Sequence, residues 1–247
     1  MSHYFITGAS AGIGAALATQ LTQSGHTVSA IARREDRLSE MGRAMPLFFG
    51  KAANVCDAAA VAAAVADSQH KCGEIDVAIL NAGIYVPQDG SAITPGVYAN
   101  HMDVNYMGVV NSLAAIVPGM IAAGRGHIVI ISSVAGWRGL PKAAAYGPTE
   151  AALISLAESL YFDLTPKGIK IQVMCPGFVD TEATAVNDFE MPGLLSADAA
   201  AKHIMFGLKK DIFSISFPKK FTRKMMFLRY LPDRLYFSLV GKLTGKF

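Results

Sequence analysis

Glycines at positions 8, 12 and 14 directly follow the first apolar run of the chain, in the segment Thr7-Gly8-Ala9-Ser10-Ala11-Gly12-Ile13-Gly14. Glycine permits a tight turn and lets the backbone approach a pyrophosphate, and a following helix offers its N-terminal amides and dipole to the anion. The spacing is GxxxGxG and not the commoner GxGxxG, but the physics is the same. We interpret this loop, Ser10 and Ile13 included, as a dinucleotide cradle; the alternative is an ordinary glycine-rich turn.

Two arginines, Arg33 and Arg34, end the second apolar run. Dinucleotide folds that prefer NAD usually place an acid here for the ribose 2′-hydroxyl, whereas an arginine accommodates the 2′-phosphate of NADP. The first acid comes only at Glu35. We therefore predict NADP(H) as cofactor, with the forked donors of Arg33 on the phosphate and the Ser10 hydroxyl beside it. The alternative is that both arginines are solvated residues at the start of a helix.

The elements that position these residues alternate along the chain. Predicted strands cover 4–7, 27–32, 45–49, 75–80, 127–132, 169–175 and 212–216, and predicted helices cover 13–24, 58–70, 101–122, 144–164 and 197–209. Pro46, Pro118, Gly168 and Pro176 are expected between elements. This alternation predicts an α/β fold with one doubly wound parallel sheet, right-handed crossovers and helices on both faces.

The composition excludes several classes of protein. The 247 residues are 52% hydrophobic and 17% charged with a net charge of +3, which suits a globular protein that binds no nucleic acid. Three distant cysteines and six scattered histidines predict neither disulfides nor a metal site. No apolar run approaches the roughly 18 residues that span a bilayer. With no signal peptide evident, we expect a cytoplasmic protein.

The positive charge is concentrated at the C-terminus. Residues 218–247 hold eight basic residues and one acid, a net +7, which leaves −4 for the other residues. Two amphipathic patterns run through this segment. We predict a dinucleotide-binding catalytic domain over 1–217 and a basic amphipathic helical extension over 218–247. Packing over a substrate mouth or against another subunit is the favoured role of the extension, and peripheral contact with an anionic membrane is the alternative.

The ordered motifs resemble the classical short-chain dehydrogenase/reductase family over nearly the whole chain. The glycine loop is similar to the family's cofactor loop, and Asn54-Val55 to its adenine contact, where the family often has Asp. The segment Asn81-Ala82-Gly83 is similar to the family's NAG motif, and Pro176-Gly177 with Val179 and Thr181 to its PGxxxT segment near the nicotinamide. The resemblance implies a single Rossmann-type domain and a homo-oligomer.

The resemblance also implies the chemistry: hydride transfer between nicotinamide and a small apolar carbonyl or alcohol substrate. Tyr146 would donate a proton to the developing alkoxide, and Ser133, thirteen residues earlier, would hold the same oxygen. Asn105 would support the site through water or backbone contacts. Ser132 is expected to face the opposite side of the strand end. In the variable loop that follows, Phe189, Met191, Leu194 and Leu195 indicate either an apolar substrate face or simple packing.

One position departs from the family pattern. The expected lysine four residues after the tyrosine is Glu150, and residues i and i+4 share a helix face. The family's lysine lowers the tyrosine pKa and holds the nicotinamide ribose. Reversing that charge costs up to ~6 kcal/mol at an effective dielectric constant of ~20, although protonation of the Glu would soften the effect. A carboxylate can still accept hydrogen bonds from ribose hydroxyls.

Three explanations of Glu150 stay open. The favoured one is a substitution in an NADP(H)-dependent reductase whose activity is impaired. The second is a catalytically inactive NADP(H)-binding protein with a regulatory or interaction role. The third is that Lys142 or Arg138, nearby in sequence, supplies the missing positive charge.

Overall fold

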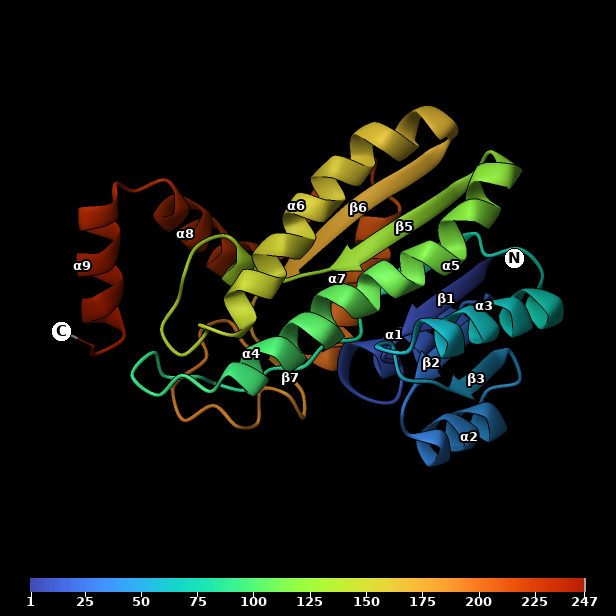
Figure 1. The fold of residues 1–247 in the computed structure, drawn as a ribbon, viewed down its shortest axis with the longest axis horizontal. Helices are drawn as coiled ribbons and strands as arrows, with labels where there is room; N and C mark the ends of the chain where they lie inside the picture. The colour runs from blue at the N-terminus through green and yellow to red at the C-terminus, as the bar shows by residue number, and fades with distance from the viewer. Residues whose placement is uncertain (247) are drawn as a thin grey trace.

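The computed structural model describes residues 1–246 and contains one seven-stranded parallel sheet (Figure 1). Its strand order is β3-β2-β1-β4-β5-β6-β9. The strands are β1 (His3–Thr7), β2 (Thr27–Ala32), β3 (Phe48–Ala52), β4 (Val77–Leu80), β5 (Gly126–Ile131), β6 (Ile169–Pro176) and β9 (Ser214–Phe217). The short strands β7 (Val179–Asp180) and β8 (Leu195–Ser196) pair separately. The predicted Rossmann-type α/β fold is confirmed.

Helices cover both faces of the sheet. They are α1 (Gly12–Gln23), α2 (Glu35–Ala44), α3 (Ala58–Cys72), α4 (Pro95–His101), α5 (Gly108–Ala123), α6 (Tyr146–Leu164), α7 (Ala197–Leu208), α8 (Lys219–Arg229) and α9 (Asp233–Leu243). Val61, Val109 and Leu153 join α3, α5 and α6 in one buried cluster, while Leu17 and Ile204 join α1 and α7 in another. Strands buried on both faces explain the continuous apolar runs in the sequence.

Several elements differ from the sequence prediction; β4, for example, begins at Val77 and β9 at Ser214, each two residues later than predicted. The third strand begins at Phe48 and not at residue 45, because residues 46–47 form the turn after α2. Helix α2 was not predicted, and its only buried residue is Leu38, so its apolar stripe is weak. The expectation that Pro118 separates elements is wrong, since Pro118 lies inside α5. Because Pro118 has no amide hydrogen, the carbonyl of Ala114 one turn earlier has no helical donor. Both residues are exposed, so water can donate to that carbonyl instead.

The run Pro95–Ala123 is helical throughout, because the π-helical turn η1 (Met102–Met107) joins α4 to α5. By length and composition alone, this 29-residue run is sufficient to cross a membrane, since an 18-residue window within it has a mean hydropathy of 1.6. The expectation that no segment reaches that length is therefore wrong, because it considered only uninterrupted apolar residues. Val109, Leu113 and Ile116 on one side of this run are buried in the core beside the sheet (Figure 1), and 33% of the apolar window is buried in all.

Helices α8 and α9 form what we call the C-terminal hairpin, residues 218–246. It extends from the end of β9, and α9 lies farthest from the sheet, at the left of Figure 1. Residue 247, the last of the predicted extension, lies outside the described residues. Arg138 anchors the hairpin by donating hydrogen bonds to the carbonyls of Leu228 and Arg229 and by pairing with Asp233.

Candidate active site

One cavity of about 1520 Å³ lies at the carboxyl ends of the parallel strands. Open α/β sheets bind their ligands at this edge. Arg138 and Met191 do not line this cavity. Of the twenty residues predicted to be catalytic or to bind the cofactor, nineteen line it: Gly8, Ser10, Gly12, Ile13, Arg33, Arg34, Asn54, Val55, Asn81, Ala82, Gly83, Asn105, Ser133, Tyr146, Glu150, Pro176, Gly177, Val179 and Thr181. The exception, Gly14, lies beneath the loop.

The glycine loop is packed so closely that side chains would not fit. Gly8 and Gly12 have φ values of +75° and +55°, which favour glycine. A Cβ on Gly14 would lie 2.3 Å from the Gly8 carbonyl oxygen, and one on Gly8 would lie 2.8 Å from the Ala82 Cα. The Thr7 hydroxyl accepts hydrogen bonds from the amides of Asn81 and Ala82, at 2.9 and 3.0 Å. The loop and the turn after β4 thus form one rigid cradle, which fits a pyrophosphate.

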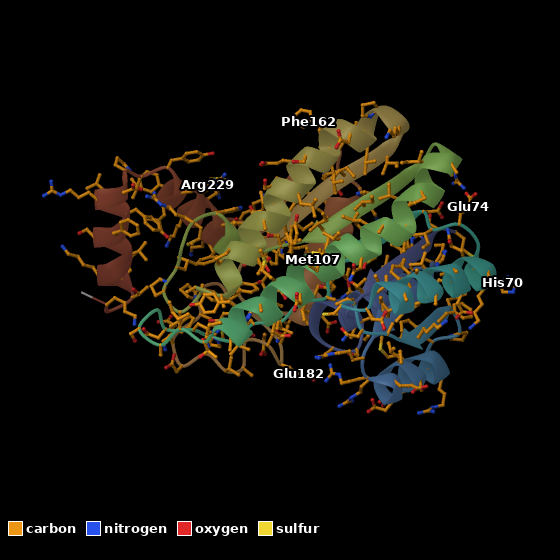
Figure 2. All side chains as sticks on the ribbon, in the orientation of Figure 1. His70, Glu74, Met107, Phe162, Glu182 and Arg229 are labelled. Atoms are coloured by element: carbon orange, nitrogen blue, oxygen red, sulfur yellow. The ribbon has the colours of Figure 1, made fainter. Side chains whose placement is uncertain are left out.

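The two arginines at the end of β2 have different surroundings. Arg34 donates through Nε to the Ser10 hydroxyl at 3.1 Å and pairs with Glu182 at 2.8 Å, so it links the glycine loop to the segment after β7. Figure 2 labels Glu182 in this region. Arg33 is exposed, lines the cavity and forms no hydrogen bond or ion pair within residues 1–246. Its donors are therefore available to an anion.

Tyr146 and Ser133 face the cavity from the start of α6 and the end of β5. The Tyr146 ring packs edge-on against Tyr85, with 5.2 Å between ring centroids. The Ser133 hydroxyl accepts a hydrogen bond from the Ala135 amide at 3.1 Å. Ser132 turns toward α6, where its hydroxyl donates to the Glu150 carbonyl at 3.0 Å. Sequence reasoning missed Tyr85, which follows the NAG motif by two residues.

Asn105 is buried in the π-helical turn and holds two segments together. Its carboxamide oxygen accepts from the Ile84 amide at 2.8 Å, and its Nδ2 donates to the Ile84 carbonyl and the Thr149 hydroxyl, both at 3.1 Å. Asn105 thereby ties the backbone after β4 to α6. Single π-helical turns of this kind occur frequently at functional sites.

Glu150 is buried one turn after Tyr146 on α6, with 3% of its surface exposed. Burial raises the pKa of its carboxyl from 4.5 to about 8, and hydrogen bonds with Ser132, Thr149 and Tyr146 only partly oppose this. The group is therefore mostly protonated at neutral pH. Burial is the main cause that raises the pKa of Tyr146 well above 10, and the charge of Glu150 is the second. A hydrogen bond with Ser133 lowers this pKa in part. A neutral acid thus occupies the position of the family's cation.

The two cations considered as substitutes are paired elsewhere. Lys142 lines the cavity, but its Nζ donates to both carboxylate oxygens of Asp188, at 2.6 and 2.8 Å. Arg138 is held by the hairpin and by the face of the Tyr236 ring, 3.9 Å from its centroid. The groups that act on the Tyr146 pKa are Glu150, Ser133, Tyr85 and Cys175, and none of them is a cation.

Aromatic side chains form one wall of the cavity beyond the catalytic residues. The Phe178 ring lies 5.7 Å from the Phe189 ring and 5.6 Å from the Phe221 ring. A Cβ on Gly177 would lie 2.7 Å from Phe221, so this glycine allows α8 to approach the site. Part of this wall comes from the C-terminal hairpin, a contact that sequence reasoning did not predict in detail.

Comparison with known proteins agrees with this geometry. Residues 2–190 match the family described as short chain dehydrogenase. The chain belongs to the short-chain dehydrogenase family. It is 31% identical over 242 residues to an uncharacterized oxidoreductase of Myxococcus xanthus, covering 96% of each chain. It is 34% identical over 211 residues to a 3-dehydrosphinganine reductase of Arabidopsis thaliana, covering 82% of this chain and 62% of that one.

Solved structures share the fold of this short-chain dehydrogenase. A short-chain dehydrogenase from Streptomyces avermitilis superposes with a TM-score of 0.85 at 22% identity, covering 99% of this chain and 98% of that one. A serine dehydrogenase complexed with NADP+ has a TM-score of 0.80 at 24% identity (87% and 94% covered). A Burkholderia phymatum enzyme in complex with NAD has a TM-score of 0.83 at 23% identity (91% and 92% covered). Proteins of this fold therefore bind either dinucleotide.

Proposed function

We propose that this short-chain dehydrogenase is an NADP(H)-dependent oxidoreductase that transfers hydride between nicotinamide and the carbonyl or alcohol carbon of an apolar substrate. One observation carries the proposal: a single cavity joins the glycine cradle and Arg33 to Ser133, Tyr146 and an aromatic wall. The unpaired guanidinium of Arg33 favours NADP(H) over NAD(H). The similarity to a protein named as a reductase supports the reduction of a carbonyl group.

The bound nicotinamide supplies the hydride, and the chain supplies the proton and the orientation. The Tyr146 hydroxyl donates its proton to the substrate oxygen, on which negative charge develops as hydride arrives. The Ser133 hydroxyl stabilises the same oxygen by a hydrogen bond. Asn105 keeps Ile84 and Thr149 in place beneath these groups.

We further propose that Glu150 weakens turnover without abolishing it. Protonated Glu150 adds no full negative charge, so the ~6 kcal/mol penalty of an ionised carboxylate applies only above its pKa. It also adds no positive charge, and so the Tyr146 pKa stays high. The expected loss is a part of the factor of about 10² to 10⁴ that general acid–base catalysis contributes.

The test compares the protein with its Glu150→Lys variant on a panel of apolar ketones and aldehydes, following NADPH absorbance. We expect turnover to rise by about 10-fold or more in the variant, because a cation there stabilises the phenolate of Tyr146. Tyr146→Phe in the Glu150→Lys background is the matched control and should remove the gain. Titration with NADPH establishes that each variant is folded. Glu150→Gln is the neutral control: it adds no cation, so it should leave turnover at neutral pH nearly unchanged.

Glu150 also supports a second candidate function, an NADP(H)-binding regulatory or interaction protein without turnover. Both candidates predict NADPH binding, so only turnover separates them. If the protein, Glu150→Lys and Glu150→Gln all bind NADPH and none oxidises it on the panel, the second candidate replaces the first. A cytoplasmic location and a homo-oligomer remain part of the proposal, and sedimentation of the purified protein tests the latter.

A further inference from the structure

The C-terminal hairpin presents large apolar side chains to solvent. Phe227 is 66% exposed and Tyr230 is 75% exposed, although both are large enough to contribute strongly to a core. Four more exposed apolar side chains follow on α9, namely Leu235, Phe237, Leu239 and Leu243. The hairpin lies at one end of the molecule, and α9 stands apart from the helices that cover the sheet (Figure 1). Within residues 1–246, nothing covers these side chains.

The same hairpin carries most of the protein's excess positive charge. Its basic residues are Lys219, Lys220, Arg223, Lys224, Arg229, Arg234, Lys242 and Lys246. Among the described residues, only Lys246 is in an ion pair, with Asp89 at 3.3 Å. The hairpin's one acid, Asp233, is paired with Arg138 of the main domain. Seven of these cations are therefore unpaired. Lys220 and Lys224 line the catalytic cavity, and the other five are exposed on the rest of the hairpin.

The inner side of the hairpin forms the far end of the catalytic cavity. Phe221, Met225 and Leu228 of α8 line that cavity together with Val240 and Leu243 of α9. The cavity is therefore continuous from Ser133 and Tyr146 to the hairpin, where Lys220, Lys224 and Lys246 line it beside these apolar side chains. A substrate with a long apolar chain fits this arrangement, with its polar group at the catalytic residues.

We propose that the C-terminal hairpin docks on an anionic membrane surface and opens the cavity toward it, so that the substrate is an apolar carbonyl compound dissolved in the bilayer. Aromatic and leucine side chains mixed with Lys and Arg are typical of helices that lie in a membrane interface. The docking stands on the hairpin alone. The substrate class rests on the proposed function.

Charge complementarity favours a membrane over a second copy of the chain. A two-fold symmetric contact through this surface would place the same unpaired cations of two hairpins against each other. Anionic headgroups neutralise those cations, and the apolar side chains between them enter the acyl region. Arg138 donates a hydrogen bond to the Leu231 carbonyl, and the Tyr236 hydroxyl donates one to the Gly139 carbonyl at 2.6 Å. These contacts keep the hairpin fixed relative to the cavity.

The test is co-sedimentation of the full chain with vesicles of phosphatidylcholine alone or mixed with phosphatidylserine. We expect binding to the mixed vesicles only, and we expect it to fall with added salt, because headgroup charge is screened beyond about 10 Å at 0.1 M. Arg223→Gln with Arg229→Gln should weaken binding on the order of 5-fold per charge removed. Phe227→Ser with Tyr230→Ser should weaken it further by removing the apolar contacts. None of these four side chains lines the cavity.

Matched controls lie elsewhere on the surface. Phe162 lies on α6, outside the hairpin, and is 76% exposed (Figure 2), so Phe162→Ser should leave vesicle binding unchanged. Arg43→Gln on α2 controls for a loss of charge. NADPH affinity should be the same in all variants, since their cradles are intact.

Two results overturn the docking: equal binding of the protein to both kinds of vesicle, or hairpin variants that bind as the controls do. Hairpin variants that change the oligomeric state and leave vesicle binding intact assign the surface to a second copy instead. The substrate class is tested separately by turnover in the Glu150→Lys background. The hairpin variants should lose activity on a vesicle-dissolved ketone but not on a short soluble one. Vesicle binding without any turnover refutes the proposed function and leaves the docking standing.

Discussion

The burial of Glu150 makes the protein's stability depend on pH in a way that one substitution should remove. The carboxyl has a pKa of about 8 when folded, against an ordinary value of 4.5. The folded state therefore holds the proton more tightly than the unfolded state does. This contribution to stability is fully present below the unfolded pKa and is lost as the pH rises through the folded pKa.

The magnitude follows from the two pKa values. Each pH unit in which the unfolded carboxyl is ionised and the folded one is protonated lowers the free energy of unfolding by about 1.4 kcal/mol. From about pH 5 to about pH 8 the loss is therefore about 3 to 4 kcal/mol. Glu150→Gln keeps the shape of the protonated acid and cannot ionise, so the variant should lack this loss.

Urea unfolding of both proteins across this pH range measures the effect. The difference in free energy of unfolding between Glu150→Gln and the unsubstituted protein should grow with pH in favour of the variant. Other titrating groups, such as His3 and His127, whose pKa values burial lowers, are present in both proteins and cancel. Differences that stay constant with pH would show that Glu150 is ionised or hydrated in the folded protein, and the account of the site would be wrong.

Three further substitutions test the cradle and the hairpin. Arg33→Ala should weaken NADPH binding by about 10- to 100-fold and leave NADH binding nearly unchanged, since charge-assisted hydrogen bonds contribute about 1.5 to 3 kcal/mol. Equal losses in titrations of the two cofactors would contradict the assignment of Arg33 to the 2′-phosphate. Gly14→Ala should weaken NADPH binding by at least about 10-fold, because the added Cβ would lie 2.3 Å from the Gly8 carbonyl oxygen. Gly42→Ala on α2 is the control and should leave binding intact, since no atom lies nearer than 3.9 Å to its added Cβ. Arg138→Ala removes hydrogen bonds that together contribute roughly 1.5 to 3 kcal/mol or more to holding the hairpin. Limited proteolysis of this variant should therefore cut first within the hairpin, while NADPH still binds. Cleavage elsewhere first would show that Arg138 does not anchor the hairpin.

Local signals predicted much of the fold. Strands buried on both faces produce continuous apolar runs, and so β1, β2 and β6 were placed within a residue or so. Helix α2 was not predicted, because only one of its residues is buried and its apolar stripe is weak. The π-helical turn around Asn105 was not predicted either, because such a turn has no period of its own in the sequence. Pro118 misled the prediction because an exposed helix position lets water satisfy the orphaned carbonyl.

The sequence by itself determined which chemical groups this protein has: a glycine cradle, adjacent arginines, a Ser–Tyr pair and a glutamate in place of a lysine. Only the tertiary structure decided their state. Burial turned Glu150 from an expected negative charge into a mostly neutral acid, because desolvation is a property of the surrounding packing. Arg34 forms an ion pair with Glu182, 148 residues away in sequence, whereas Arg33 forms none within residues 1–246 and can bind a ligand. The hairpin came to line the catalytic cavity for the same reason: contacts between distant segments exist only after the chain has folded.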